Sequence, residues 1–342
     1  MQASHFLIVL VFLFRIKIVF NPFFLFVLIL SLYIFLVELY YSSFNFSENY
    51  IDSLFFLFNF IVCLVFYDYL HNRNLNYFID GLFFSGLISF VGVLIYGFGL
   101  TVDAVGGRSI GTFNNPNQLG YFSVCLASAS FLLYRACEVK KTYVFFLVIL
   151  CSFLSIASLS KAAMIPIALL IPLVILPRSV DFIKISVACF VFLIFLSIFL
   201  NFYHNGYLND IRAYHRLSSM FEESDSSLES RGYFAFTEGN ELQFLFGLGR
   251  ENVRQIVGHE VHSTLWSVFN CYGLVGFSIF LWGLITWAFE LLKSFGFVTF
   301  CGTWFPPMLY GLFHNGSRFT FFWILLALSF ALISRKRAYI NF

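Results

Sequence analysis

The chain has 342 residues, of which 60% are hydrophobic and 11% are charged, and its mean hydropathy is +0.86. A soluble domain is about 45–50% apolar and about 25% charged, so this composition excludes a cytosolic enzyme, a secreted disulfide scaffold and a disordered chain. The formal net charge of +2 gives no indication of a nucleic-acid partner, and the sequence therefore predicts an all-α polytopic membrane protein.

Long apolar runs mark the expected membrane-spanning helices. Such a helix needs about 20 predominantly apolar residues, and ten runs come close to that length or exceed it. We expect spans at 23–41, 54–70, 78–100, 119–134, 143–160, 162–177, 182–203, 264–292, 295–313 and 319–333. The run 5–20 is a further candidate, although Arg15 and Lys17 fall near its end, so the prediction is ten or eleven helices.

The distribution of basic residues predicts how these helices are oriented. Short cytoplasmic loops carry an excess of Lys and Arg, so the basic tail at 335–337 is placed in the cytoplasm. Counting back along the chain, twelve basic residues fall on that side. The short loops on the opposite side hold Arg108, Lys161 and Arg318.

The larger polar segments fall on the outer side of this topology. One large loop covers 204–262, and a smaller polar loop covers 101–118. The sequence contains no internal repeat and no Pro-rich linker. We therefore expect a single transmembrane domain over 1–342, with the large loop as an extracytoplasmic cap.

The smaller outer loop carries the first candidate site. Residues 106–118 read Gly-Gly-Arg-Ser-Ile-Gly-Thr-Phe-Asn-Asn-Pro-Asn-Gln and run directly into a predicted helix. Glycine allows a backbone to approach a ligand closely, a helix N-terminus favours an anion, and the Arg108 guanidinium matches phosphate. The alternative is an ordinary turn with helix caps, because Asn and Pro are common in both.

Lys161, in the sequence Ser160-Lys161-Ala162, is the second candidate and lies between two apolar runs. A Lys at the edge of the hydrocarbon often acts as an anchor whose ammonium reaches the interface. It can equally face a polar cavity and hold an anionic group. The sequence leaves both interpretations open.

The second half of the large loop contains an aromatic-rich segment that begins at Arg231. Apolar residues recur between 233 and 245 at spacings that predict an amphipathic helix, which would lie on the membrane or on the bundle. The alternative interpretation of Arg231 is a solvated charge at a helix end.

His262 stands where the large loop enters a predicted spanning helix. A His can take or give a proton near neutral pH, although a His at a helix start is often a cap or a satisfied polar group. His259 could join it as a metal ligand, but no third ligand is evident, so we expect no metal site. The sequence also lacks a Walker motif, a Cys-x-x-Cys pair and an outer Asp-x-Asp pair.

Taken together, these segments resemble the O-antigen ligase and O-antigen polymerase superfamily of bacterial inner-membrane glycosyltransferases. The resemblance covers about residues 80–333 and lies in the order, spacing and predicted sidedness of the motifs. The run 108–117 resembles the family's Arg/Gly/Asn-Pro-Asn loop, and Lys161 stands where the family usually has Arg. Arg231, with the aromatic residues and the Phe-Gly-Leu-Gly run that follow, resembles the Arg that opens the second half of the family's periplasmic loop.

The last motif of the resemblance is centred on His262. His262-Ser263, followed by Gly273 and Gly276, resembles the family's His-Asn and glycine pair, with Ser263 in place of the commoner Asn. The resemblance implies a metal-independent, GT-C-like fold of transmembrane helices that uses no cofactor. It implies the following roles: catalytic, His262 and Arg231; diphosphate-binding, Arg108, Lys161 and Arg231; loop-shaping, Gly111, Asn115, Pro116 and Asn117.

The function implied by the resemblance is polymerisation of O-antigen or a related surface polysaccharide. The donor would be an undecaprenyl-diphosphate-linked oligosaccharide, used on the periplasmic face of the inner membrane, with the C-terminus in the cytoplasm. Membrane lipid is an expected partner, and a chain-length regulator is a further candidate partner. The short chain and compact outer loop favour a polymerase over a ligase that transfers the polymer to lipid A core.

Two functions from other classes stay open at this point. A transporter or flippase of lipid-linked sugars predicts charges buried mid-span and often a repeated half, whereas Glu38, Asp68, Asp80 and Glu290 lie near predicted helix ends. A membrane scaffold without chemistry is the other alternative. It predicts that single changes at His262 or Arg231 leave the polymer unchanged.

Overall fold

The computed structural model describes residues 3–14, 19–44, 50–73, 75–96, 108–137, 139–176, 194 and 231–340. Every regular element in these ranges is a helix, and no strand occurs within them. Six of the described helices are long and apolar enough to cross a membrane. The expected all-α class is confirmed, and the chain is a multi-pass membrane protein.

The described helices follow the predicted apolar runs. In chain order they are α1 (Ala3–Phe14), η1 (Pro22–Phe24), α2 (Leu25–Phe44), α3 (Ile51–Asn72), α4 (Asn76–Tyr96), α5 (Pro116–Ala136), α6 (Lys141–Ser158), α7 (Lys161–Ile175), η4 (Ala235–Glu238), α10 (Glu241–Phe246), α11 (Arg250–Val257), α12 (Thr264–Phe295), α13 (Phe297–Thr303), α14 (Phe305–Phe313) and α15 (Thr320–Ile340). The candidate spans are Pro22–Ser43, Ile51–Asn72, Asn76–Ile95, Pro116–Ala136, Lys141–Ser158 and Thr264–Phe295.

The predicted span 295–313 is wrong as a single helix, because it consists of α13 and α14 with a break at Trp304. Pro306 and Pro307 follow the break. A proline has no amide hydrogen to continue the helical bonding, and it disfavours helical geometry in the residue before it, so the chain starts a new helix there. The predicted span 182–203 and the part of the large outer loop at 204–230 lie outside the described residues.

The chain divides into two compact units, which we describe separately. Unit 1 comprises Met1–Phe78, Ser227–Gly296 and Gly311–Phe342, and unit 2 comprises Ile79–Ser226 and Phe297–Tyr310. The expectation of a single transmembrane domain over 1–342 stays a prediction.

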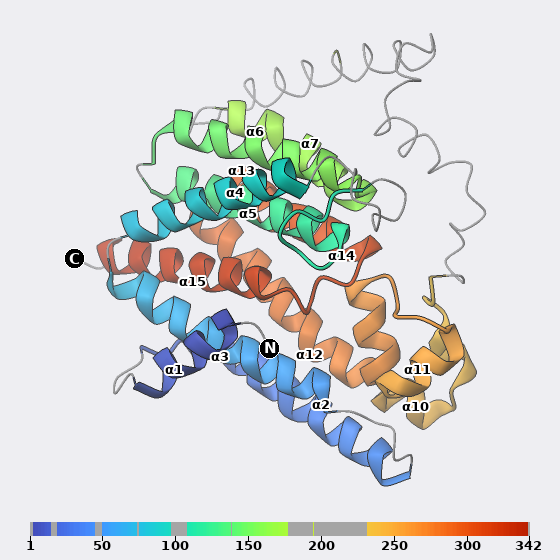
Figure 1. Cartoon of the computed structure of the whole chain (residues 1–342). Helices are drawn as coiled ribbons and strands as arrows, with labels where there is room; N and C mark the ends of the chain where they lie inside the picture. The colour runs from blue at the N-terminus through green and yellow to red at the C-terminus, as the bar shows by residue number, and fades with distance from the viewer. Residues whose placement is uncertain are drawn as a thin grey trace. The chain divides into compact units, whose positions relative to one another are not determined.

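In unit 1, α3 packs against α2 and α15, and α12 packs against the same two helices (Figure 1). Large rings fill the space between them, including the fully buried Trp287 and Trp323. Gly283 of α12 allows α2 to approach, because a Cβ at that position would lie 2.4 Å from the ring of Phe26. These contacts hold the first turn of α3 and the first half of α12 in one body.

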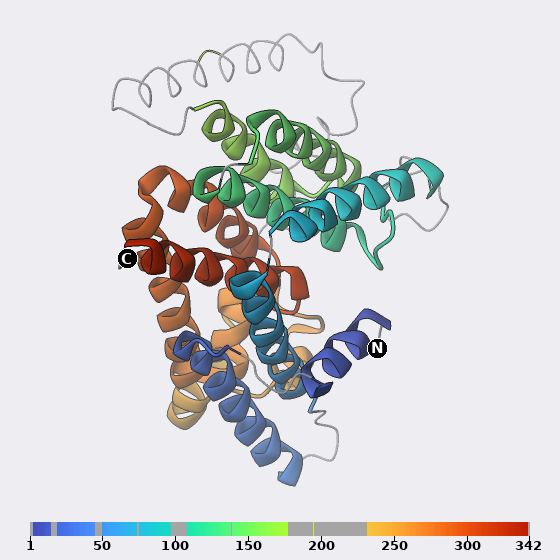
Figure 2. The same cartoon turned by 90° about the vertical axis from the view of Figure 1, so that its left-hand side faces the viewer.

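In unit 2, α5 is the central helix and packs against α6, α7 and α13. Figure 2 shows the green ribbons of α5, α6 and α7 lying together. Nearly every residue of α5 between its first and last turns is buried. Small residues make this possible: a Cβ on Gly302 of α13 would lie 2.2 Å from the ring of Phe131. The start of α5, where the smaller outer loop enters it, is thereby fixed against α6 and α7.

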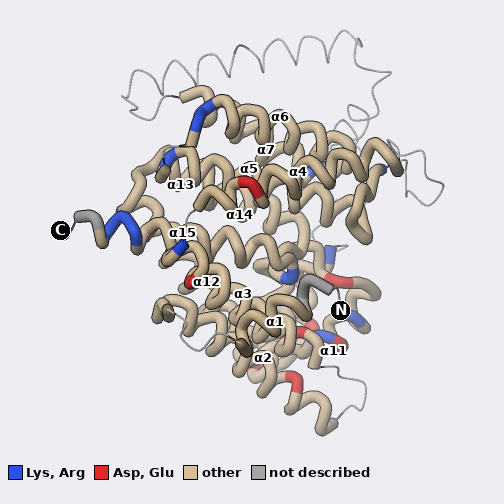
Figure 3. Tube along the Cα trace, turned by 60° about the vertical axis from the view of Figure 1, so that its left-hand side comes forward, with Lys and Arg blue, Asp and Glu red and all other residues tan. Residues whose placement is uncertain are grey.

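Charged residues of unit 1 gather at the two ends of α3. At its carboxyl end, the Arg335 guanidinium donates hydrogen bonds to the carbonyls of His71 and Arg73, whereas Asp52 lies in the first turn at the other end. Twenty residues at 1.5 Å each separate these ends by about 30 Å. Figure 3 shows the basic end of α15 and the mixed charges near α11. The two ends agree with the predicted alternation, and the absolute orientation stays a prediction.

Candidate functional site

Arg108 lies at the described start of the smaller outer loop and binds back to unit 2. Its Nε donates to the carbonyl of Ser158 at 2.9 Å, and its Nη2 donates to Oδ1 of Asn117 at 2.6 Å. The amide of Ser109 donates to the carbonyl of Ala157 at 2.9 Å. Both of these guanidinium partners are neutral oxygens, so the two bonds fix the direction of the guanidinium without neutralising its charge.

The amide-rich part of the loop caps α5. The side chain of Asn115 accepts a hydrogen bond from the backbone amide three residues later at 2.8 Å, and Pro116 occupies the first helical position. Gly111 has a φ of +54°, a left-handed conformation that favours glycine. The turn-and-cap interpretation is confirmed for these residues. Asn117 differs from them, because its side chain joins Arg108 to the first turn of α5.

Lys161 is the first residue of α7 and is half-buried. The chain reaches it through Leu159, whose φ of 47° turns the backbone sharply between α6 and α7. The carbonyl of Ser158, just before this turn, accepts the bond from Arg108. A Cβ on Gly120 of α5 would lie 3.0 Å from the Ser158 hydroxyl. The loop, the start of α5 and the start of α7 therefore meet at one end of unit 2.

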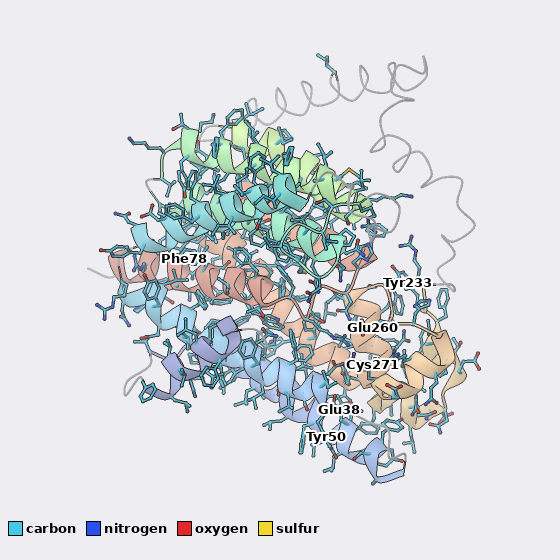
Figure 4. All side chains as sticks on the ribbon, viewed as in Figure 1. Glu38, Tyr50, Phe78, Tyr233, Glu260 and Cys271 are labelled. Atoms are coloured by element: carbon cyan, nitrogen blue, oxygen red, sulfur yellow. The ribbon has the colours of Figure 1, made fainter. Side chains whose placement is uncertain are left out.

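Arg231 and His262 are brought together in unit 1. The amide of His262 donates to the carbonyl of Arg231 at 3.2 Å. The hydroxyl of Tyr233 donates to the carbonyl of Leu312 at 2.7 Å and lies 3.4 Å from the carbonyl of His262. Burial raises the pKa of Tyr233, and the nearby Arg231 guanidinium offsets part of that rise. Figure 4 shows Tyr233 beside the start of α12.

Two further histidines accompany the exposed His262. The ring of His259 stacks on it with centroids 4.9 Å apart, and the ring of His314 meets it edge-on at 6.0 Å. His314 lies in the loop before α15, and its carbonyl accepts a hydrogen bond from the Thr264 hydroxyl at 3.1 Å. Sequence reasoning missed His314 because it is distant along the chain. Among the described residues, no group of three His, Cys, Asp or Glu side chains could hold a metal ion.

The predicted amphipathic helix over 231–247 is wrong. The segment forms a turn, then η4, then the separate short helix α10. Asn240 starts α10 with a capping box, in which its side chain accepts from the Gln243 amide while the Gln243 side chain accepts from the Asn240 amide. A capping box begins a new helix, so the apolar spacing reflects two short elements and not one continuous face.

The aromatic residues of this segment pack on α12. Phe236 stacks on Trp266 with centroids 6.1 Å apart and meets Phe269 edge-on at 5.1 Å. Phe244 meets the same Phe269 ring at 5.5 Å. A shallow apolar groove of about 510 Å³ lies beside them, and its lining includes Phe236, Phe244 and Leu245. The groove gives this part of unit 1 an apolar surface close to Tyr233.

The two glycines of the last motif permit close backbone approaches. α12 bends at Gly273, whose φ is +65°, and a Cβ there would lie 2.4 Å from the amide nitrogen of Gly247. The amide of Leu248 donates to the carbonyl of Asn270 at 3.0 Å and so satisfies a carbonyl near the bend. A Cβ on Gly276 would lie 2.9 Å from a tyrosine ring of α2. The bend therefore seats α10 and the residues after it against α12.

Four charged residues that were not predicted as site residues form a closed ring beside the histidines. Arg250 lies 2.8 Å from an Asp52 oxygen and 3.0 Å from a Glu260 oxygen. Arg318 completes the ring, because it lies 3.2 Å from Asp52 and 2.8 Å from Glu260. Figure 4 labels Glu260 in this region.

The electrostatics of the ring favour the charged forms of Glu260 and Arg318. Burial alone would raise the pKa of Glu260, but Arg318 and Arg250 hold it below its ordinary value of 4.5. Burial alone would lower the pKa of Arg318, but Asp52 and Glu260 raise it above its usual range. The sequence did indicate that such charges would be paired, because a charged residue at the edge of a spanning helix needs a partner. Local sequence patterns could not show which residue is the partner of each charge, because the partners are distant along the chain.

No protein-family model matches the chain, and no curated protein matches it. The described helices define the class as a multi-pass helical membrane protein with polar clusters at helix ends. The resemblance to the O-antigen superfamily rests on the motifs and stays a prediction. The structure places Arg108 and Lys161 in unit 2, and it places Arg231 and His262 in unit 1.

Proposed function

We propose that this protein is a polymerase of O-antigen or a related surface polysaccharide in the bacterial inner membrane. It joins undecaprenyl-diphosphate-linked oligosaccharide repeat units on the periplasmic face. The observation that supports this most is the backbone hydrogen bond between Arg231 and His262, which brings these two residues of the resemblance together just before the spanning helix α12. The proposed transfer is independent of metal ions and cofactors.

In the proposed reaction, a sugar hydroxyl of the acceptor attacks the anomeric carbon of the donor. The bond from that carbon to the diphosphate oxygen breaks with its electron pair staying on the diphosphate, and a glycosidic bond forms with inversion. His262 accepts the hydroxyl proton as general base. Fixed positive charge stabilises the negative charge that grows on the leaving group. Arg231, whose backbone carbonyl accepts a hydrogen bond from the His262 amide, is the residue proposed to supply it.

Arg108 and Lys161 are the proposed diphosphate-binding cations of unit 2. The Arg108 guanidinium is already oriented by Ser158 and Asn117, which reduces the side-chain entropy lost when an anion binds. Lys161 stands at the first position of α7, where the helix dipole also favours negative charge. Both features are those that a diphosphate site needs.

Lipopolysaccharide banding in a deletion strain tests the proposal. Loss of the ladder with a single repeat retained on the core supports a polymerase. Complete loss of O-antigen with accumulation of lipid-linked polymer would instead identify a ligase, and an unchanged ladder would contradict both. The transporter alternative is tested by giving the purified protein a labelled lipid-linked repeat. Transport of the repeat without chain growth would contradict the enzyme proposal.

Single substitutions then test the site. We expect His262→Ala and Arg231→Ala to reduce polymer formation strongly, because a positioned general base typically contributes about 10²–10⁴-fold. The matched control is Arg254→Ala, an exposed basic residue of α11 in the same unit, which should behave as wild type. Unchanged polymer in both site variants at normal protein levels would favour the scaffold alternative.

A further inference from the structure

The charge ring, which consists of Asp52, Arg250, Glu260 and Arg318, connects segments of unit 1 that are distant in sequence. Asp52 lies in the first turn of α3, and Arg250 begins α11. Glu260 lies in the loop before α12, and Arg318 lies in the loop before α15. Each guanidinium contacts both carboxylates at 2.8–3.2 Å, so every charge has two opposite neighbours and the ring is balanced.

One side of the ring is anchored in the helical core. The side chain of Asp52 is 7% exposed, and it also accepts a hydrogen bond from the Tyr272 hydroxyl of α12 at 2.5 Å. The amide of Asp52 donates to Glu38 of α2 at 3.2 Å. On the other side, the side chain of Glu260 is 53% exposed. The ring therefore ties accessible loops to a buried point shared by α2, α3 and α12.

The loops tied in this way are the two that carry the histidines. Glu260 stands between His259 and His262 in the chain, and Arg318 lies shortly after His314. Both loops also contact the start of α12, because Thr264 bonds to the carbonyl of His314. A displacement of either end of the ring would change how the three imidazole rings meet.

We propose that the charge ring positions His262 and His314 for the transfer reaction. The four ring members act through the histidine loops and do not touch substrate. Partly buried ion pairs add little net stability, since desolvation offsets their attraction, and their best-attested use is to select one arrangement among alternatives. Here that arrangement is the geometry of two loops. The catalytic part of the inference rests on the proposed function, whereas the effect on loop geometry does not.

Hydrogen exchange of the full-length protein in detergent tests the loop geometry directly. Glu260→Gln keeps the side-chain shape, removes one charge from the exposed side of the ring and leaves the buried Asp52 in place. We expect the amides of His262 and Gly316, which are hydrogen-bonded in the wild type, to exchange about five- to thirtyfold faster. The Arg73 amide, bonded at the far end of α3, should not change.

The matched control for exchange is Arg254→Gln, which removes an exposed charge from α11 without touching the ring. It should leave all of these amides as they are in the wild type. Equal exchange in Glu260→Gln and Arg254→Gln would overturn the proposal.

The second measurement is transfer with purified lipid-linked repeats. A loss of positioning lowers kcat by about 100-fold in Glu260→Gln and leaves KM unchanged, because misplaced reacting groups affect the chemical step. Arg318→Lys should retain more kcat than Arg318→Gln, since it keeps one positive charge in the ring. Faster exchange with an unchanged kcat would overturn the positioning role.

The two measurements also separate the inference from the proposed function. Wild-type protein without transferase activity would overturn the proposed function. The exchange comparison would then still decide whether the ring holds the two histidine loops.

Discussion

Arg108 and Lys161 are two cations at one end of unit 2 that differ in how their side chains are held. Two neutral oxygens orient the Arg108 guanidinium, whereas Lys161 begins α7 as a half-buried point charge. Arg presents a rigid planar fork and Lys presents a compact ammonium on a flexible stem. In the proposed diphosphate site, the direction of the side chain therefore matters at Arg108, and its charge matters at Lys161. The sequence predicted both cations, but it could not reveal the bonds that orient Arg108.

Substitution of Lys161 distinguishes a charge requirement from a membrane anchor. We expect Lys161→Arg to keep most of the polymerising activity, because the charge at the start of α7 is retained. Lys161→Ala should lose most of it, because stabilisation of the diphosphate is lost. The measurement is the polysaccharide ladder in a complemented deletion strain. Equal ladders for all three proteins would show that Lys161 is only an anchor.

The charge ring predicts a specific pH dependence of stability. The pKa of Glu260 is held below its ordinary value of 4.5, so its contribution to stability is fully present above that value and is lost as pH falls through the folded pKa. Wild-type protein should therefore unfold at a higher temperature than Glu260→Gln at pH 7. The difference should shrink below pH 4.5.

Thermal unfolding in detergent, followed from pH 7 down to about pH 3, measures this difference. The ring would not be the source of the effect if the difference between the two proteins stayed constant throughout.

At the scale of elements, hydropathy predicts where the described spanning helices lie, because their length is set by the bilayer. It fails where backbone chemistry interrupts an apolar run. Pro306 and Pro307 break the run 295–313, and the capping box at Asn240 divides 231–247. Both interruptions have a signal in the sequence. The first is the pair of prolines, and the second is an Asn followed by a Gln three residues later.

The bend in α12 predicts an unusually damaging glycine substitution. Gly273→Ala places a Cβ 2.4 Å from a backbone nitrogen and also forces a left-handed conformation. Gly258 has a similar φ of +78°, but a Cβ there would meet open space. Gly258→Ala therefore measures the free-energy cost of the left-handed conformation alone.

We expect Gly258→Ala to cost about 1–2 kcal/mol and Gly273→Ala to cost about 1–3 kcal/mol more from overpacking. Chemical denaturation in detergent gives both values. Equal losses of unfolding free energy in the two variants would mean that α10 moves away from the added Cβ at no cost.

At the scale of the molecule, the ends of α3 define two poles of unit 1. Basic residues near Arg73 occupy one pole and the charge ring occupies the other, about 30 Å away along the helix. The sequence predicted this separation from loop charges. It could not predict the ring, because the partners of Asp52 lie far along the chain and meet only when the helices pack.

Labelling of engineered cysteines tests the orientation of these poles. Arg254→Cys should react with a membrane-impermeant maleimide in intact spheroplasts, because α11 lies near the ring. Lys336→Cys should react only after permeabilisation, because its side chain lies at the pole with the basic tail. Labelling of both positions from the same side would contradict the predicted topology.

α12 is longer than the hydrocarbon layer that it crosses. Its 32 residues would measure about 48 Å along a straight axis, whereas the hydrocarbon core is about 30 Å thick, and the bend at Gly273 divides that length into two parts. The stretch from Gly273 to Lys293 already matches that thickness, so the predicted topology puts the turns that follow His262 at the level of the lipid headgroups. Acyl-chain length in the surrounding bilayer then becomes a variable of the proposed transfer, since a thicker membrane draws His262 towards the hydrocarbon and a thinner one raises it into water.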